Sequence, residues 1–302
     1  MLSKSSNVPT FISTLMQIIH SIRALQVWRR NHQLKGGTIG FVPTLGALHE
    51  GHRSLLQRAR KTSDTVVASI FVNPLQFGPS EDFHCYPRTL ATDQSMCLQE
   101  GVDLLFIPKP HELYPTDFQT SVRISLLTTR WEGERRPQHF LGVTTIVTKL
   151  LILVLPNHAF FGQKDYQQFL VVKQLVKDLN LNVRIVGCPT IRESDGLASS
   201  SRNRYLTTRQ RTEAAQLYQT LRHGAQMIRQ GIRQKRGIER AIITRLTRTT
   251  SATIDYIAIC NSQTLEPLTK ITGQVVLLGA ICLGKVRLID NLKVQVPQGR
   301  KP

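Results

Sequence analysis

Residues 38–52, TIGFVPTLGALHEGH, contain a candidate strand, a turn and the start of a candidate helix. Residues 38–44 are largely apolar on both faces, as expected of a strand buried inside a parallel sheet. A turn containing glycine follows at once, and a helical pattern then covers residues 53–62. Parallel α/β sheets are built from strands that run into helices through short turns, so this stretch predicts an α/β fold.

The same alternation of strand and helix continues to residue 189. Further buried strands are expected at residues 65–72, 103–108, 159–162 and 183–189, and helices at residues 89–100, 143–155 and 165–179. This order predicts a Rossmann-like, doubly wound parallel sheet. Upstream of it, the periodic apolar positions of residues 11–28 predict a helix.

A second pattern begins after residue 189. We expect two helices, at residues 207–230 and 237–247, followed by strands at residues 253–260, 274–283 and 286–289. This is the pattern of a smaller α+β domain. The length of 302 residues also fits two domains, which we place at residues 1–190 and 191–302.

Composition narrows the class of protein. Hydrophobic residues make up 41% and charged residues 20%, close to ordinary globular usage. The longest apolar run, residues 150–155, is too short for a membrane span. The five cysteines are scattered and form no C-x-x-C pair, which argues against a disulfide framework and a zinc site and favours the cytoplasm. No metal-ligating residue is predicted.

The net charge of +19 is the least ordinary feature. Such an excess favours polyanionic partners, nucleic acid among them. Between Arg202 and Arg248 twelve Lys or Arg residues face only two glutamates. Aromatic residues do not alternate with these charges as a base-stacking surface requires. A solvated basic helical face is therefore favoured, and binding of nucleic acid is expected only as a minor alternative.

Polar motifs follow the predicted strands at the positions where α/β sheets bind ligands. In PTLGALHEGH, Gly46 and Gly51 allow close approach of the backbone, and the helix N-terminus favours an anion. His49 and His52 lie three residues apart on one helix face, from which both could donate hydrogen bonds to phosphate oxygens. The alternative is that one histidine caps the turn and the other is exposed.

The second motif, SIFVNPLQFGPSEDFHCYPRT, offers neutral amides from Asn73 and Gln76. Amides suit a small hydroxylated carboxylic acid because they add no negative charge beside a nucleotide. The alternative is an Asn-Pro turn with Gln76 in solvent.

Two later motifs supply groups for phosphates. FFGQKDYQQF places Lys164, Asp165 and Gln168 at the opening of a helix, although a lone lysine at such a place is often only a surface residue. IRESDGLASSSRNRYL joins a hydroxyl-rich turn, Ser200 and Ser201, to the guanidinium of Arg202. Its alternative is a helix cap beside a basic surface cluster.

Taken in order, these four motifs closely resemble those of pantothenate synthetases, the pantoate–β-alanine ligase family of the nucleotidyltransferases with an H-x-G-H motif. The resemblance continues through HFLGVTTIVTKLL and LGKVRLIDN and covers residues 21–292. It implies a Rossmann-like catalytic domain that binds ATP and pantoate, a smaller C-terminal lid domain, and a homodimer.

The resemblance also implies a reaction, with ATP as a substrate and Mg²⁺ as the metal ion that binds with ATP. The carboxylate of pantoate attacks the α-phosphate of ATP, and pyrophosphate leaves. The amine of β-alanine then attacks the pantoyl adenylate, which yields pantothenate and AMP.

Site residues follow by matching motifs. The resemblance implies catalytic roles for His49, His52 and Lys164 and substrate contacts for Gln76, Gln168 and Asn73. The implied ATP site comprises Leu45, Gly46, Ala47, Leu48, His49, Glu50, Gly51, His52, Gly162, Gln163, Lys164, Asp165, Ile191, Ser199, Ser200, Ser201 and Arg202.

Several positions depart from the family pattern. Leu45 stands where Met is common, Gln163 replaces Glu, and Ser199 replaces an apolar residue. Leu141 and Gln138 replace Arg and Gly in the loop around HFLGV. Two alternatives stay open beside the ligase. One is a nucleotidyltransferase that releases its nucleotidyl product, and the other is a catalytically weakened relative that binds nucleic acid through its basic region.

Overall fold

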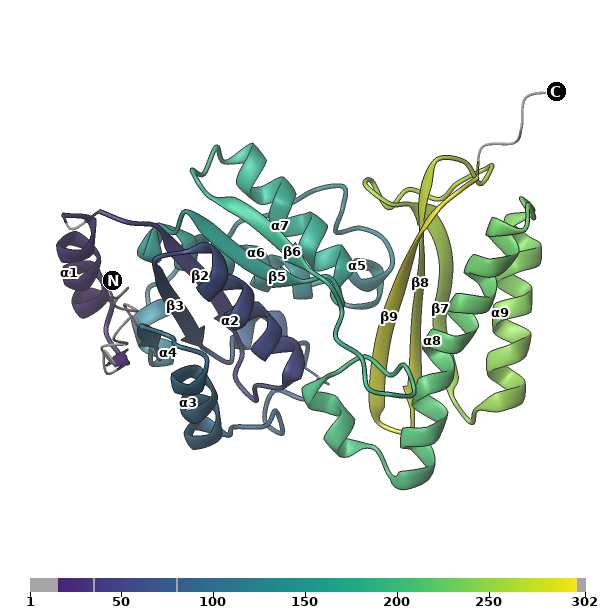
Figure 1. Ribbon diagram of the computed structural model, residues 1–302, viewed down its shortest axis with the longest axis horizontal. Coiled ribbons are helices and arrows are strands. Elements are labelled where there is room, and N and C mark those ends of the chain that lie inside the picture. Colours follow the sequence, from purple (N-terminus) through teal and green to yellow (C-terminus); the bar gives the residue numbers. More distant parts are fainter. Residues whose placement is uncertain (1–15, 35, 80, 298–302) are drawn as a thin grey trace, which may run out of the picture.

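The structure is a computed structural model that describes residues 16–34, 36–79 and 81–297 (Figure 1). Its larger part is a six-stranded sheet in the order β1-β4-β3-β2-β5-β6, in which every pair is parallel. The strands are β1 (Gln17–Ile19), β2 (Ile39–Thr44), β3 (Thr65–Ile70), β4 (Leu104–Phe106), β5 (His158–Gly162) and β6 (Arg184–Cys188). The predicted Rossmann-like sheet and its five strands are confirmed.

The prediction of a helix over residues 11–28 is confirmed from Ile22 to Trp28 and was wrong for residues 17–19. Gln17–Ile19 form the edge strand β1, which pairs with β4, and α1 (Ile22–Gln33) begins only after Ser21. Ser21 Oγ accepts a hydrogen bond from the backbone N–H of Ala24 over 3.3 Å and caps this helix. A three-residue strand is too short to show a period of two, so the apolar residues of β1 resemble the start of the helix. Residues 11–15 lie outside the described residues.

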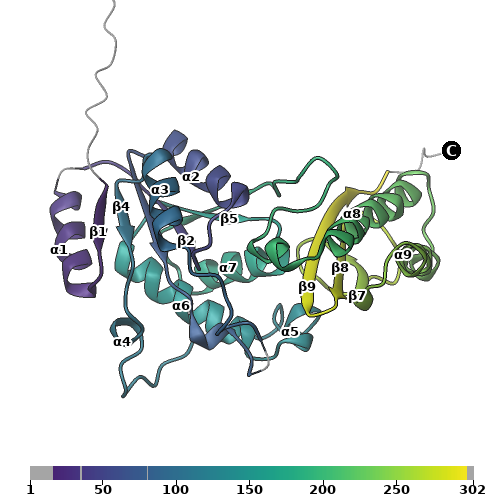
Figure 2. The same cartoon turned by 90° about the horizontal axis from the view of Figure 1, so that it is seen from below.

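Helices cover both faces of the sheet (Figures 1 and 2). On one face, α2 (Glu50–Thr62) and α3 (Leu90–Gln99) bury Leu56 and Cys97 against Val66. On the other face, α1, α6 (His139–Val154) and α7 (Tyr166–Asp178) pack around Phe41 and Val67. The short elements are η1 (Pro74–Gln76), α4 (Pro110–Leu113), α5 (Glu132–Arg135) and η2 (Ser201–Tyr205).

A smaller α+β domain follows, as predicted. Its sheet is antiparallel in the order β7-β8-β9, with β7 (Thr253–Asn261), β8 (Gln274–Leu283) and β9 (Val286–Gln295). The long helices α8 (Thr208–Arg229) and α9 (Lys235–Thr249) cover the face turned away from the larger sheet (Figure 1). Strand β9 extends beyond the predicted end at residue 289, since the polar residues Asp290 and Asn291, which ended the apolar pattern, are buried in the middle of the strand. The boundary between residues 190 and 191 stays a prediction.

The two sheets are joined through α7 and α5. Apolar residues of β7 and β8, such as Cys260 and Leu278, belong to the same hydrophobic cluster as Phe169 of α7. The buried carboxylate of Glu132 on α5 pairs with Arg287 of β9 over 2.6 Å. These contacts hold β9 beside the carboxyl ends of the larger sheet. In the described part of the chain, no helix is both long and apolar enough to cross a membrane.

Candidate active site

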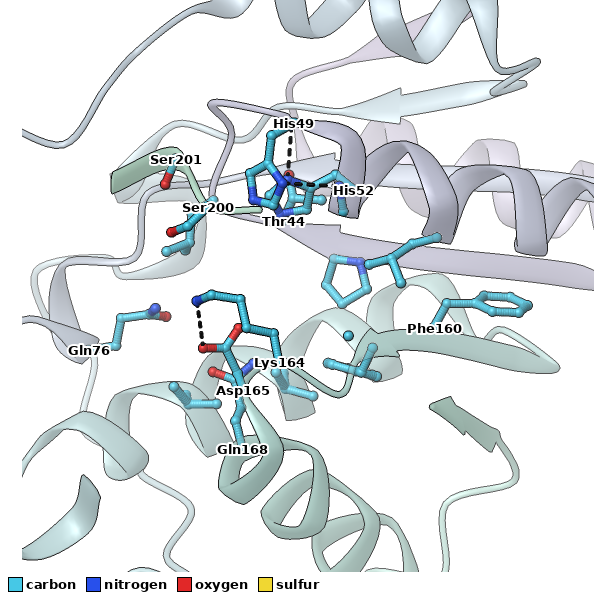
Figure 3. Close-up of a pocket in the computed structure, with 18 of the residues that line it drawn as sticks. Thr44, His49, His52, Gln76, Phe160, Lys164, Asp165, Gln168, Ser200 and Ser201 are labelled. Atoms are coloured by element: carbon cyan, nitrogen blue, oxygen red, sulfur yellow. Dashed lines mark hydrogen bonds and ion pairs between the residues drawn. The ribbon is translucent and has the colours of Figure 1, made fainter. Parts of the chain in front are cut away.

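A cavity opens at the carboxyl ends of β2 and β5 (Figure 3). Strand β2 pairs with β3 on one side and with β5 on the other, so the order of strands along the chain reverses here. The crevice at such a reversal is the usual ligand site of an open α/β sheet. The turns after β2 and β5 deliver residues of the first and third motifs to the two sides of this crevice.

A buried carboxylate shapes the turn after β2. Asp93 of α3 accepts hydrogen bonds from the backbone N–H groups of Ala47 and Leu48, each over 2.9 Å. Gly46 and Ala47 both have positive φ, 87° and 50°. Such a turn is strained for alanine, and the carboxylate compensates by satisfying two buried donors. Asp93 therefore fixes the start of α2, although no sequence motif singled it out.

His49 and His52 begin α2 and cap it reciprocally. His49 Nδ1 accepts a hydrogen bond from Gly51 N–H over 3.1 Å, and His52 Nδ1 accepts one from His49 N–H over 3.4 Å. A side chain at residue 51 would collide with the His49 ring, since an added Cβ would lie 2.7 Å from its Cε1. The glycine of the H-x-G-H spacing is what lets this ring fold back onto the helix end.

Both imidazoles are neutral donors at neutral pH. Burial, followed by the nearby His52 and Lys164, lowers the pKa of His49 to about 2, and burial lowers the pKa of His52 to about 4. Each Nδ1 accepts a hydrogen bond from a backbone N–H, so the single ring proton lies on Nε2. The simpler alternative, with one capping and one exposed histidine, does not hold: both histidines cap the helix end, both rings line the cavity, and neither is exposed.

The second motif contributes a neutral amide, that of Gln76, to the lining of the cavity. Gln76 is buried, and its Oε1 accepts a hydrogen bond from Asn73 Nδ2 over 3.0 Å, so its Nε2 remains free to donate. His139 Nδ1 lies 2.9 Å from the Gln76 carbonyl oxygen and fixes the backbone there. Asn73 does not line the cavity: it is fully buried and bonds Gln76 and the Gly142 carbonyl. Asn73 therefore supports Gln76 from behind.

The turn after β5 presents a cation beside an acid. Lys164 Nζ lies 3.7 Å from Asp165 Oδ1, and both side chains face the cavity together with Gln168 of α7 (Figure 3). Asp165 occupies the N-cap position of α7 but makes no capping hydrogen bond, so its carboxylate stays available. Asn291 of β9 donates to the carbonyl oxygen of Lys164 over 2.8 Å and ties this turn to the smaller domain.

The fourth motif brings hydroxyls and a guanidinium. Ser200 Oγ accepts a hydrogen bond from Arg202 N–H over 3.3 Å and caps η2. The Arg202 guanidinium forms two hydrogen bonds to Asp82, of 2.9 and 2.8 Å, and beside it Ser201 Oγ lies 3.4 Å from the Tyr86 hydroxyl. Arg202 thus faces the cavity while paired with a carboxylate that an incoming phosphate can replace.

The structure brings most of the predicted site residues together. The predicted residues that line the cavity are Leu45, His49, Gly51, His52, Gln76, Gly162, Lys164, Asp165, Gln168, Ile191, Ser199, Ser200, Ser201 and Arg202. The others lie outside it. Gly46, Ala47 and Leu48 are buried in the turn behind the wall, Glu50 is exposed beside Arg53, and Gln163 contributes its carbonyl to Asn291.

Several lining residues escaped sequence reasoning. Arg136 follows α5 and His139 is the first residue of α6, at a place where the sequence departs from the family pattern. The apolar floor contains Val143 and Val147 of α6, whose helical period indicated only core packing. Thr44 and Tyr86 also line the cavity. Thr44 and Tyr86 belong to the first two motifs, whereas the fold brings Arg136 and the valines of α6 to them from elsewhere in the sequence.

The charges of the cavity are unequal. Among its described lining residues the permanent cations are Arg136, Lys164 and Arg202, and the carboxylate is Asp165. Such a cavity attracts a polyphosphate, and its neutral amides suit a small polar acid. Fold and site together define an enzyme of the nucleotidyltransferase class.

Comparison with known proteins identifies the family. The sequence profile of pantoate-beta-alanine ligase matches residues 17–293. The pantothenate synthetase of Moorella thermoacetica is 47% identical over 281 residues, which cover 93% of this chain and 99% of the relative. That of Thermotoga neapolitana is 48% identical over 276 residues, with 91% and 99% covered.

Solved structures agree with the sequences. The pantothenate synthetase of Thermus thermophilus has a TM-score of 0.87 and 44% identity, covering 92% of this chain and 99% of that one. The pantoate-beta-alanine ligase of Francisella tularensis, complexed with beta-gamma ATP and beta-alanine, has a TM-score of 0.76 and 37% identity, with 92% and 97% covered. The chain belongs to the pantoate-beta-alanine ligase family and is a ligase.

Proposed function

We propose that this chain joins pantoate to β-alanine at the expense of ATP, through enzyme-held pantoyl adenylate. The proposal rests on the set of side chains that lines one cavity. The neutral imidazoles of His49 and His52, the cations of Lys164 and Arg202, and the amides of Gln76 and Gln168 all line this cavity. This arrangement suits a nucleotide polyphosphate next to a small hydroxylated acid.

In the first step, ATP lies along the turn of residues 45–52, with its adenine near the backbone of Ile191. A carboxylate oxygen of pantoate attacks the α-phosphorus, and the bond to the bridging oxygen of pyrophosphate breaks. The Nε2–H groups of His49 and His52 donate to the α-phosphate oxygens, whose charge grows as the fifth bond forms. Lys164, Arg202 and Ser200 bind the phosphates that leave as pyrophosphate.

Gln76 and Gln168 hold the pantoyl group. The free Nε2–H₂ of Gln76 donates to an oxygen of pantoate, and Gln168 approaches from α7. In the second step, the uncharged amine of β-alanine attacks the pantoyl carbonyl carbon, and the bond to the AMP oxygen breaks. The amide product keeps one oxygen of the original carboxylate, and AMP carries the other.

Mg²⁺ is proposed to enter with ATP. Among the described residues no cluster of three or more His, Cys, Asp or Glu side chains could hold a metal ion alone. Mg²⁺ keeps several waters and commonly binds through phosphates with one or two carboxylates. Asp165, whose carboxylate has no capping hydrogen bond, is the residue that fits such a contact. The ion would offset the negative charge of the phosphates.

The smaller domain is proposed to act as a lid. An acyl adenylate is hydrolysed when water reaches it, so the site must stay dry through both steps. Asn291 of β9 reaches across to the turn that holds Lys164, which places the smaller domain at the cavity. A homodimer and a location in the cytoplasm remain predictions from family resemblance and from the scattered cysteines.

The direct test measures AMP and pantothenate formed from Mg-ATP, pantoate and β-alanine, with each component omitted in turn. The wild type should form both products only with all components, and His49→Ala should lower kcat about 10²- to 10³-fold, as loss of one transition-state donor does. His111→Ala changes an exposed histidine on α4 and serves as the control. Folded protein that forms no AMP would refute the proposal, and a released nucleotidyl product without amide would favour a plain nucleotidyltransferase.

A further inference from the structure

A hydroxyl lies against the first histidine of the site. Ser199 Oγ is 3.1 Å from His49 Nδ1, although the two residues are 150 positions apart in the sequence. Ser199 directly precedes the hydroxyl-rich turn of Ser200 and Ser201, and it lines the same cavity. The contact therefore joins the turn that faces the phosphates to the histidine at the start of α2.

The direction of this hydrogen bond follows from a neighbour. The backbone N–H of Gly51 donates to His49 Nδ1, so this nitrogen carries no proton of its own. Burial keeps the ring neutral, since it lowers the pKa of His49 to about 2. Ser199 must then be the donor, and the proton of the ring lies on Nε2. Two donors, one from backbone and one from a side chain, select the same tautomer.

Ser199 is itself held by a hairpin of residues 191–199. Its backbone N–H donates to the Ile191 carbonyl over 2.9 Å, and Arg192 pairs with Ala198 in an antiparallel bridge. The hairpin turns at Gly196, where φ is 94°. The position of the Ser199 hydroxyl therefore depends on the position of the hairpin.

The smaller domain holds this hairpin firmly. The Arg192 guanidinium makes a bidentate pair with the buried Asp290 of β9, at 2.7 and 2.9 Å, and lies 3.5 Å from the ring centroid of Tyr218 on α8. Arg211 of α8 pairs with Asp195 at the tip over 2.5 Å. A path of contacts thus runs from β9 and α8 through the hairpin to His49.

We propose that Ser199 is a positioning residue for His49: its hydroxyl donates to Nδ1, holds the tautomer that carries its proton on Nε2, and links the ring to the smaller domain through the 191–199 hairpin. The inference rests on the proposed function for the role of Nε2–H. Ser199 is a position at which this chain departs from the pattern of the family that it resembles, and in this chain Gly51 N–H also donates to His49 Nδ1. The effect on rate should therefore be moderate.

The experiment compares Ser199→Ala, Ser199→Thr and the control Ser95→Ala, an exposed serine of α3. In protein labelled with ¹⁵N-histidine, the His49 nitrogen signals are assigned through their loss in His49→Gln. Ser199→Ala should move the Nδ1 signal and lower kcat roughly 2- to 10-fold, as expected of one neutral hydrogen bond. KM for ATP should change less than kcat, and Ser199→Thr, which keeps the hydroxyl, should restore both the signal and the rate.

Two results would overturn the inference. One is an unchanged His49 Nδ1 signal in folded Ser199→Ala. The other is a loss of rate that Ser199→Thr fails to restore, because it would show that Ser199 matters only through its size or backbone. A failure of the proposed function can be told apart from a failure of this inference. If the wild type forms no AMP, the proposed function is wrong, but the NMR spectra still decide whether Ser199 donates to His49.

Discussion

The side-chain amide of Asn291 on β9 donates a hydrogen bond to the backbone carbonyl of Lys164, over 2.8 Å. The same amide nitrogen donates to the Gln163 carbonyl, also over 2.8 Å. One buried residue of the smaller domain therefore fixes the turn that carries a cation of the cavity. The arrangement of the two domains depends in part on these two bonds.

Loss of this amide should let water into the site. In Asn291→Ala, we expect more AMP than pantothenate, because pantoyl adenylate would be hydrolysed before β-alanine attacks. The measurement is the ratio of the two products at saturating substrates, which should stay near one in the wild type. Gln295→Ala removes an exposed amide near the end of the same strand and serves as the control. An unchanged ratio in Asn291→Ala would argue against a sealing role for this contact.

Asp93 should matter for both stability and activity. Asp93→Ala leaves the buried N–H groups of Ala47 and Leu48 without a partner in a turn of positive φ. Unfolding by urea should show a loss of about 2–3 kcal/mol in the free energy of unfolding, together with a lower kcat. Asp117→Ala removes an exposed carboxylate and should change both values little. Equal stability of the two variants would mean that Asp93 does not hold the turn.

Arg202 and Asp82 should affect ATP binding in opposite directions. Arg202→Ala removes a cation from the phosphate side and should raise KM for ATP, by roughly tenfold for a charge-assisted contact. Asp82→Asn removes the carboxylate that now pairs with this guanidinium, so KM for ATP should fall. Steady-state kinetics with varied ATP measures both. A rise of KM in folded Asp82→Asn would show that Asp82 orients Arg202 instead of competing with the phosphate.

Three partly buried histidines should make the fold sensitive to mild acid. Burial lowers the pKa of His49 to about 2 and those of His52 and His139 to about 4, below the usual value of 6.5. The unfolded chain therefore binds more protons below pH 6.5. The stability that these groups contribute is complete above that pH and is lost as the pH falls, by up to about 1.4 kcal/mol per pH unit for each group.

His139→Gln tests this pH dependence. The glutamine can still donate to the Gln76 carbonyl, but it does not titrate. Between pH 6.5 and 5 the free energy of unfolding should fall less steeply with decreasing pH in the variant than in the wild type. The two slopes should differ by the contribution of one titrating histidine. This window lies above the range in which the carboxylates titrate. Equal slopes of the free energy of unfolding against pH for the two proteins would mean that His139 does not contribute the predicted pH dependence.

The sequence was sufficient for the sheet and for most of the site because both depend on local patterns. Buried strands ending in TLGALHEGH and FFGQKD could be placed without any knowledge of distant contacts. Strand β1 was missed because three residues show no period. Asp93 and Arg136 were missed because they contribute through the fold: Asp93 supports a turn 46 residues away, and Arg136 enters the cavity from a loop without a motif.

The fate of one oxygen atom tests the proposed chemistry most directly. Pantoate labelled with ¹⁸O in its carboxylate is converted with ATP and β-alanine, and the products are analysed by mass spectrometry. Attack on the α-phosphorus predicts one ¹⁸O in AMP, one in pantothenate and none in pyrophosphate. Label in inorganic phosphate with release of ADP, or AMP without ¹⁸O, would contradict pantoyl adenylate as the intermediate.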